Sequence, residues 1–293
     1  VLISKDKIIG QAGLIPIKLK IEEKILPATW FIDFAVLPEF QNQGYGKILT
    51  EEWMKICPNQ ITYCNENSLR VFKKFGWEVN YNTKTLAKPI NLIKFLPFFK
   101  NFELNFLNSF YKNLNRKSKI ENKLLKPYTI NENYKIISDS FNLKKNKENS
   151  SIEICRDEEW FKWRILDCPF KKNIYFFEHK NTFAVVNIFK SKKIKRLNII
   201  YTFCLDVDYQ EDLINLIFNW ALNNEIDLVW ANSNDSELIK KYEKVFTNKF
   251  TKKMNFASWS SDKIIHKKLN HHAPCTHAID SDNDLISIED NSL

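Results

Sequence analysis

Two glycines, Gly44 and Gly46, stand two positions apart where an apolar, strand-like run gives way to a helical pattern. A loop that enters a helix presents unpaired backbone N–H groups and the positive end of the helix dipole. Glycine permits a positive φ there and leaves room for an anion such as pyrophosphate to approach. The pattern predicts an anion-binding loop, to which the side chains of Gln41 and Gln43 can add donors. A glycine-containing turn without a ligand is the alternative interpretation.

The elements that must position this loop follow from the hydrophobic periodicity. The run Leu26–Leu37 is rich in β-branched and aromatic residues and predicts a strand. From Lys47 apolar residues recur at helical spacing until Pro58, and Ile61–Cys64 then predicts a short strand. Two earlier strands are expected over residues 1–5 and 7–14, joined by a turn at positions 6 and 7.

A second helix is expected after the short strand, with Asn65 as a candidate N-cap and Gly76 as its end. The order is therefore strand, tight loop, helix, strand, helix. Such an order describes an α/β layer whose sheet is partly parallel.

The second half of the chain repeats this order. Asp208 is a candidate cap for a helix, Ile226–Ala231 predicts a strand, and Leu238, Tyr242 and Val245 mark another helix. Both halves leave a strand through Asn-x-Asn and enter a helix that bears lysines, which predicts a duplicated helix–strand–helix unit. The second half contains no glycine, and the acidic residues of 205–212 would repel a pyrophosphate.

Composition narrows the classes of protein. The chain has 293 residues and a formal net charge of +9, of which +6 lies between Pro89 and Pro127. Apolar runs are too short for a membrane-spanning helix, and the six dispersed cysteines are typical of reduced thiols in a cytoplasmic protein. The chain begins at Val1 without a signal-like segment, and we expect that its natural start lies further upstream.

Residues 89–127 mix bulky apolar side chains with lysines. We interpret the segment as a basic helical connector packed between the two halves. A helix that lies on an anionic membrane surface is the alternative interpretation, because the same composition suits such an interface.

The residues around the glycine pair resemble the Q/R-x-x-G-x-G/A signature of the GNAT superfamily of acetyltransferases. The apolar strand that ends in Val36-x-Pro38-Glu39-Phe40 is also usual in that family, as are the amphipathic helix, the short strand with Asn65, and a close that reads Phe75-Gly76-Trp77 here. The resemblance covers roughly residues 1–79.

The resemblance implies acetyl-CoA as co-substrate and no metal. The pyrophosphate would bind the amides of the loop, and the pantetheine would run beside the strand edge at Phe34–Val36. Asn65 falls where the family often contacts the cofactor arm, although a helix cap is an equally good interpretation. The implied cofactor-binding residues are Phe34, Val36, Gln41, Asn42, Gln43, Gly44, Tyr45, Gly46, Lys47 and Asn65.

The implied chemistry is direct attack of a neutral amine on the thioester, which requires a proton acceptor and an amide donor for the oxyanion. The backbone N–H near Phe34 or Val36 is the candidate for the oxyanion, and Asp33 is the one carboxylate in the key strand and so a candidate base. The tyrosine that often serves as acid in the family aligns with Phe72, which has no proton to give.

These features together predict an α/β fold, with a GNAT-like mixed sheet flanked by helices and two GNAT-like halves. We expect an acetyl-CoA-binding domain at 1–88, the basic connector at 89–127, a degenerate GNAT-like domain at 128–262 and a polar tail at 263–293.

The expected acceptor is a small amine. Tandem arrangements of this kind resemble acetyltransferases of bacterial surface-polysaccharide pathways, which suggests an amino sugar or a nucleotide sugar. Two alternatives remain: a Fem-type aminoacyl transferase, and a non-catalytic GNAT-fold module that contacts nucleic acid or a membrane through residues 89–127. No nucleic-acid or membrane partner is firmly indicated.

Three weaker signals favour structural roles. The spacing of His271, His272, Cys275 and His277 is too close for an ordinary zinc site. The acidic residues at 280, 282 and 284 lack the glycine and glutamate that a calcium loop needs. Trp160 and Trp163 could stack on a sugar or base, but at helical spacing they are more typical of a core.

Overall fold

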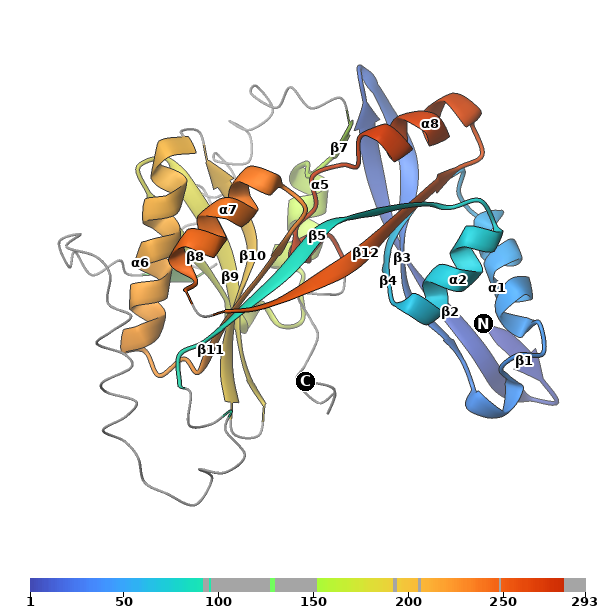
Figure 1. The fold of residues 1–293 in the computed structure, drawn as a ribbon, viewed down its shortest axis with the longest axis horizontal. Coiled ribbons are helices and arrows are strands. Elements are labelled where there is room, and N and C mark those ends of the chain that lie inside the picture. Colours follow the sequence, from blue (N-terminus) through green and yellow to red (C-terminus); the bar gives the residue numbers. More distant parts are fainter. Residues whose placement is uncertain are drawn as a thin grey trace. The chain divides into compact units, whose positions relative to one another are not determined.

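The computed structural model describes residues 1–91, 95, 127–129, 152–191, 194–204, 207–247 and 249–281. The chain divides into two compact units, and each is described here by itself (Figure 1). Unit 1 comprises residues 1–83, 149–155 and 253–276, and unit 2 comprises 84–148, 156–252 and 277–293.

The sheet of unit 1 begins as an antiparallel meander. The strands β1 (Leu2–Ser4), β2 (Lys7–Ile21) and β3 (Lys24–Val36) follow one another, and β4 (Asn59–Cys64) then lies parallel to β3. Lys5 and Asp6 both have positive φ angles, 45° and 62°, as a tight two-residue hairpin turn requires. This turn lies one position earlier than the sequence pattern predicts.

The two faces of this sheet carry different layers. On one face α1 (Tyr45–Met54) and α2 (Glu66–Lys74) cover an aromatic cluster, and Gly76, at φ 75°, ends α2 as expected. On the other face α8 (Lys263–His271) contributes Leu269, which is 1% exposed, to a core with β7 (Ile152–Ile154).

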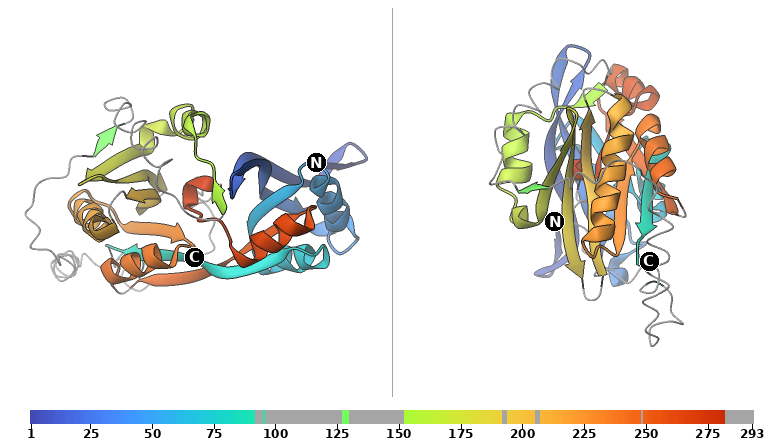
Figure 2. Two further views of the ribbon diagram at one scale, coloured as in Figure 1. Left: turned by 90° about the horizontal axis from the view of Figure 1, so that it is seen from above. Right: turned by 90° about the vertical axis from the view of Figure 1, so that its left-hand side faces the viewer.

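Unit 2 repeats the same order of elements, with helices α6 and α7 side by side on one face of its sheet (Figure 1, Figure 2). Its hairpin turn at Lys180 and Asn181 again has two positive φ angles, 48° and 57°. Its described elements are β6 (Tyr128–Thr129), α5 (Glu158–Phe161), the π-helical turn η4 (Lys162–Leu166), the 3₁₀ turn η5 (Lys171–Asn173), β8 (Ile174–His179), β9 (Thr182–Ser191), β10 (Ile194–Cys204), η6 (Val207–Tyr209), α6 (Gln210–Asn223), β11 (Leu228–Ser233), α7 (Ser236–Val245) and η7 (Ala278–Asp280).

Each sheet is completed by a strand from the other half of the sequence. In unit 2, β11 pairs antiparallel with the second part of β5 (Glu78–Pro89), which follows α2 in the chain. In unit 1, β4 pairs antiparallel with the second part of β12 (Phe250–Ser260), which follows α7. The two final strands are therefore exchanged between the repeated units.

The expected α/β fold with a mixed sheet flanked by helices is confirmed. The expected polar tail at 263–293 is wrong for its first part, because residues 263–271 form a packed helix and residues 276–281 are buried. The rest of the tail, and nearly all of the connector at 89–127, lie outside the described residues. Asp208 lies in η6, and Tyr209 occupies the N-cap position of α6.

Candidate functional site

The loop after β3 turns sharply into α1. The short 3₁₀ turn η1 (Pro38–Phe40) follows the strand, and Asn42 has a positive φ of 62°. Gly44 occupies the N-cap position of α1 at φ 89°, in a left-handed conformation that favours glycine. A Cβ at position 44 would meet no atom within 4 Å, so the conformation, and not crowding, is what requires glycine there.

The backbone amides of this loop form a candidate binding site. Lys47 N and Ile48 N donate to Gly44 O over 3.0 and 3.2 Å and begin the helix. Within the part of the chain that the structure describes, the amides of residues 42–46 have no acceptor. The first turn of α1 carries no acidic residue, so the helix dipole leaves a positive end beside five free donors. This is the arrangement that binds a phosphate.

The two glutamines bind the backbone of their own loop. Gln41 Nε2 donates to Val36 O over 2.9 Å, and Gln43 Nε2 donates to Glu39 O over 2.8 Å. Both side-chain amides therefore hold the loop in shape, and each has a second N–H, whose contact with an anion stays a prediction. Lys7 secures the same turn through an exposed ion pair with Glu39, at 2.9 Å.

A strand bulge places the candidate catalytic residues. β3 pairs with β2 at Ile32–Gly13 and at Ala35–Gln11, so Asp33 and Phe34 together face one residue, and Asp33 has a φ of 52°. The Asp33 side chain is exposed. Phe34 turns to the face of Phe31, at a ring distance of 5.4 Å, which strict alternation would not allow.

The bulge lies just beyond the point where β3 and β4 stop pairing. Their last pair is Phe31 with Thr62, whose Oγ1 donates to Phe31 O over 2.8 Å. From Ile32 to Val36 the edge of β3 that faces away from β2 has no strand partner among the described residues. Its backbone groups are thus open beside the free amides of the loop.

Aromatic rings fill the helix-covered side of this edge. Phe72, which is 1% exposed, lies 5.6 Å from the ring of Phe31 and 6.0 Å from that of Phe34. Trp53 and Trp77 stack at 5.2 Å and close the cluster from α1 and from the start of β5. A Cβ on Gly46 would lie 3.6 Å from Phe34 Cζ, so α1 begins directly over this ring.

Two residues at the end of β4 were not singled out from the sequence. Tyr63 is the first residue after the last β3–β4 pair, and its hydroxyl donates to Thr276 Oγ1 over 2.7 Å. Cys64 Sγ lies 3.7 Å from Asn255 O, and burial raises the pKa of this thiol to about 12. Only the position of the strand end brings these residues to the site, so no local sequence signal identified them.

Asn65 takes the cap role that we considered for it. Its side chain accepts from Ser68 N over 2.9 Å and from Ser68 Oγ over 3.1 Å at the start of α2. Its contact with a cofactor arm stays a prediction.

The corresponding helix start in unit 2, that of α6, carries negative charge, unlike the start of α1. The first turn of α6 carries Glu211 and Asp212, and Gln210, which is 7% exposed, accepts from Lys241 over 2.9 Å. Negative charge in the first turn disfavours an anion there.

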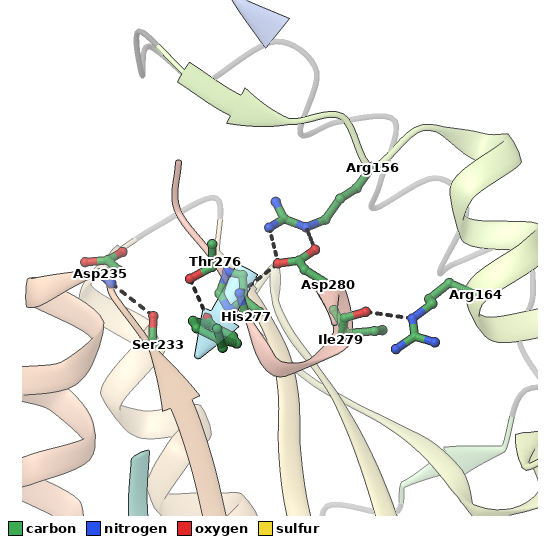
Figure 3. A network of polar contacts seen from close by, with 9 residues as sticks. Arg156, Arg164, Ser233, Asp235, Thr276, His277, Ile279 and Asp280 are labelled. Carbon is green, nitrogen blue, oxygen red and sulfur yellow. Dashed lines mark hydrogen bonds and ion pairs between the residues drawn. The ribbon is translucent and has the colours of Figure 1, made fainter. Parts of the chain in front are cut away.

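The residues considered as metal ligands lie in a different setting. Asp280 pairs with Arg156 in a buried ion pair, and His277 N donates to the same carboxylate over 2.7 Å (Figure 3). Within the described ranges there is no cluster of three or more residues that could hold a metal ion. Trp160 is buried, as a core residue would be, whereas Trp163 is 43% exposed.

The fold and the loop are similar to those of GNAT proteins. Residues 1–77 match the model of the Acetyltransferase (GNAT) family, so the resemblance of this part of the chain is confirmed. Comparison with curated protein sequences found no match.

Solved structures of the same fold cover most of the chain. N-myristoyltransferase from Saccharomyces cerevisiae, with bound myristoyl-CoA, has a TM-score of 0.58 and 12% identity over 87% of this chain and 64% of its own. A GCN5-related N-acetyltransferase from Kribbella flavida has a TM-score of 0.52 and 10% identity over 87% and 58%. One from Anabaena variabilis has 0.50 and 13% over 86% and 60%. The chain spans about three fifths of the length of these proteins.

No helix among the described residues is both long and apolar enough to cross a membrane.

Proposed function

We propose that this protein transfers an acetyl group from acetyl-CoA to a small amine. The observation that carries the proposal is the set of free amides at residues 42–46, placed at the start of α1 and beside the open edge of β3. The amides and the helix dipole bind the pyrophosphate. The pantetheine arm pairs with the backbone from Phe34 to Val36, which brings the thioester to the bulge.

The aromatic cluster supports a short acyl group. Phe31, Phe34 and Phe72 pack with ring distances of 5.4–6.0 Å on the helix-covered side of the open edge. A long acyl chain would need a channel through these rings, whereas an acetyl group needs none. Acetyl-CoA therefore fits this chain better than the myristoyl-CoA of its S. cerevisiae structural relative.

The reaction proceeds by direct attack of the amine on the thioester. The nitrogen lone pair forms the new C–N bond, a backbone N–H near Phe34 stabilises the oxyanion, and the C–S bond then breaks to release CoA thiolate. A thiol with a pKa near ~8.5 leaves without a dedicated acid. We assign Cys64 no role as acyl carrier, because burial raises the pKa of its thiol to about 12 and so leaves less thiolate than an ordinary cysteine has.

The proton leaves the amine through solvent or through the exposed carboxylate of Asp33. Asp33 lies in the bulge, one residue before the oxyanion donor, and its side chain is exposed. For the acceptor we propose an amino sugar or a nucleotide sugar, on the resemblance to tandem acetyltransferases stated above. A cytoplasmic location accords with acetyl-CoA as donor.

Calorimetric titration of acetyl-CoA tests the donor site. We expect the wild type to bind and Gly44→Glu to lose binding at least tenfold, because a carboxylate would stand beside the free amides. Gly76→Glu is a matched control: Gly76 also has a positive φ, 75°, and open space, so it pays a similar backbone cost away from the loop. Equal binding by all three proteins would place the cofactor elsewhere and overturn the proposal.

A second variant distinguishes the proposed enzyme from the alternative, a non-catalytic binding module. Replacement of Lys112, Arg116, Lys117 and Lys119 by alanine removes four charges from the basic segment. The proposed enzyme keeps its turnover of a screened amine in this variant. Absence of turnover in the wild type, together with loss of polyanion binding in the variant, would favour the module.

A further inference from the structure

The two units share more than the order of their elements. In unit 2, β10 corresponds to β3 and β11 to β4. The β10–β11 pairing stops at Ile199 with Ala231, as the β3–β4 pairing stops at Phe31 with Thr62. β10 also carries a bulge just past this point, where Ile200 is the extra residue. Unit 2 therefore has the same separation of strands that we propose for the cofactor arm in unit 1.

In unit 2 this position is already filled by the chain itself. Ser233, two residues past the last β10–β11 pair, forms an antiparallel bridge with His277. On its other side Ser233 pairs with Lys84 of β5, so His277 must lie on the side of β11 that faces β10. The residues that follow, in η7, pack against both β10 and β11.

This segment, residues 277–281, is as deeply buried as the residues of the hydrophobic core. Ala278, Ile279 and Ser281 are 0% exposed, Asp280 is 1% exposed, and the His277 ring lies 4.8 Å from that of Tyr201 in the bulge.

Two arginines, Arg156 just before α5 and Arg164 in η4, bind three residues of segment 277–281 (Figure 3). Arg156 Nε and Nη2 donate to the two oxygens of Asp280 over 2.7 and 2.6 Å. Arg164 Nε donates to Ile279 O over 2.7 Å, and its Nη2 donates to Ser281 O. Two carbonyls and the carboxylate of the segment are thus held by side chains from outside it.

We propose that segment 277–281 is an internal ligand of unit 2, occupying the position that corresponds to the acyl-CoA arm in unit 1. The segment lies between the separated strands, where a cofactor arm would otherwise bind. Unit 2 therefore needs no glycine loop to bind a pyrophosphate. Within the described residues, the loop of unit 1 is consequently the one acyl-CoA site. This last consequence rests on the function proposed above, whereas the occupancy of unit 2 does not.

Hydrogen exchange of the full-length chain tests the occupancy directly. We expect the amides of residues 278–281 to exchange only with global unfolding of unit 2, at the rate of the β10 core. Asp280→Asn should speed their exchange on the order of a hundredfold or more, because it removes the charge of Asp280 from its buried ion pair with Arg156. Asp6→Asn, the same chemical change in an exposed turn, should leave the rates unchanged.

Titration of acetyl-CoA tests the single site. One equivalent should bind the wild type, and Gly44→Glu should show only that one site, weakened at least tenfold. A second equivalent, or a binding step that Gly44→Glu leaves at wild-type affinity, would overturn the proposal. If the wild type does not bind at all, the proposed function fails, and the exchange rates still decide the occupancy. Exchange of residues 278–281 that is faster than global unfolding would show that the segment leaves its place and would refute it.

Discussion

Tyr63 donates a 2.7 Å hydrogen bond to Thr276, although 213 residues separate the two in sequence. Tyr63 is the first residue of β4 beyond its last pair with β3, at the open edge of the candidate site, and Thr276 directly precedes segment 277–281. The bond therefore ties the strand end that borders the site to a part of the chain far away in sequence. Its loss should be measurable in stability.

Tyr63→Phe and Thr276→Val should each lower the free energy of unfolding by about 1 kcal/mol, since each removes one partner of this bond and Thr276 is 0% exposed. The double variant should cost clearly less than the sum of the two, because the bond between the two side chains can be lost only once. Urea unfolding of the four proteins measures the coupling. Tyr81→Phe, at a 49% exposed position, serves as control. Full additivity would show that the bond contributes nothing.

Phe34→Ala should relax the choice of acyl group. Removing the ring opens space between Gly46 and Phe72, so butanoyl-CoA should gain on acetyl-CoA by about tenfold in relative kcat/KM, a difference of ~1.4 kcal/mol. A series of acyl-CoA donors with one amine measures the ratio. Phe250→Ala, at a position that is 67% exposed, should leave the ratio as in the wild type. An unchanged acyl-group preference in Phe34→Ala would show that this ring does not border the acyl site.

Stability toward acid should depend on Asp280. Burial alone would raise the pKa of this carboxyl, but the charge of Arg156 and its hydrogen bonds lower the pKa below the ordinary 3.8. A group with a depressed folded pKa gives stability above its unfolded pKa, and the stability is lost as pH falls through the folded pKa. The wild type should therefore lose stability steeply below pH ~4. Asp280→Asn, less stable at pH 7 by about 3 kcal/mol, should show a flatter acid limb. If urea titrations showed that the unfolding free energy of the wild type and of Asp280→Asn falls equally steeply below pH ~4, this prediction would be contradicted.

Cys64 should be inert in the folded protein. With a pKa of about 12 instead of 9.0, its thiolate fraction at pH 8 is roughly a thousandfold below that of an ordinary thiol. Alkylation by iodoacetamide, followed by mass spectrometry, should modify Cys64 only after unfolding. Cys64→Ser should retain turnover. Rapid labelling, or an acetyl group trapped on this sulfur, would point to a covalent intermediate instead of direct transfer.

Local sequence was sufficient for the loop and for the helix, strand and helix that follow it. The positive φ of Gly44, the helix that begins at Tyr45 and the cap at Asn65 all depend on residues within a few positions of one another. Local propensity and periodicity report on such contacts, which is why the GNAT resemblance could be found. The bulge at Asp33 could be considered only as a possibility, because a bulge depends on the register with β2.

Local sequence patterns could not predict which distant segments pack together. The polar composition of 263–293 predicts a tail, but Leu269 packs into the core of unit 1 and Ile279 into that of unit 2. Their burial depends on partners that lie more than 100 residues away, such as Ile15 for Leu269 and Arg164 for Ile279. Polar residues there are satisfied by one another, so hydropathy gives no sign of the burial.

The sequence by itself determined the glycine loop, the helix behind it and the repeated order of elements, because each rests on φ preferences, caps and periodicity within one segment. Only the tertiary structure decided that the final strands are exchanged between the units, that Tyr63 reaches Thr276, and that residues 277–281 fill the open strands of unit 2. Strand pairing and burial are settled by the free energy of bringing distant segments together, and that free energy depends on contacts that no single segment encodes.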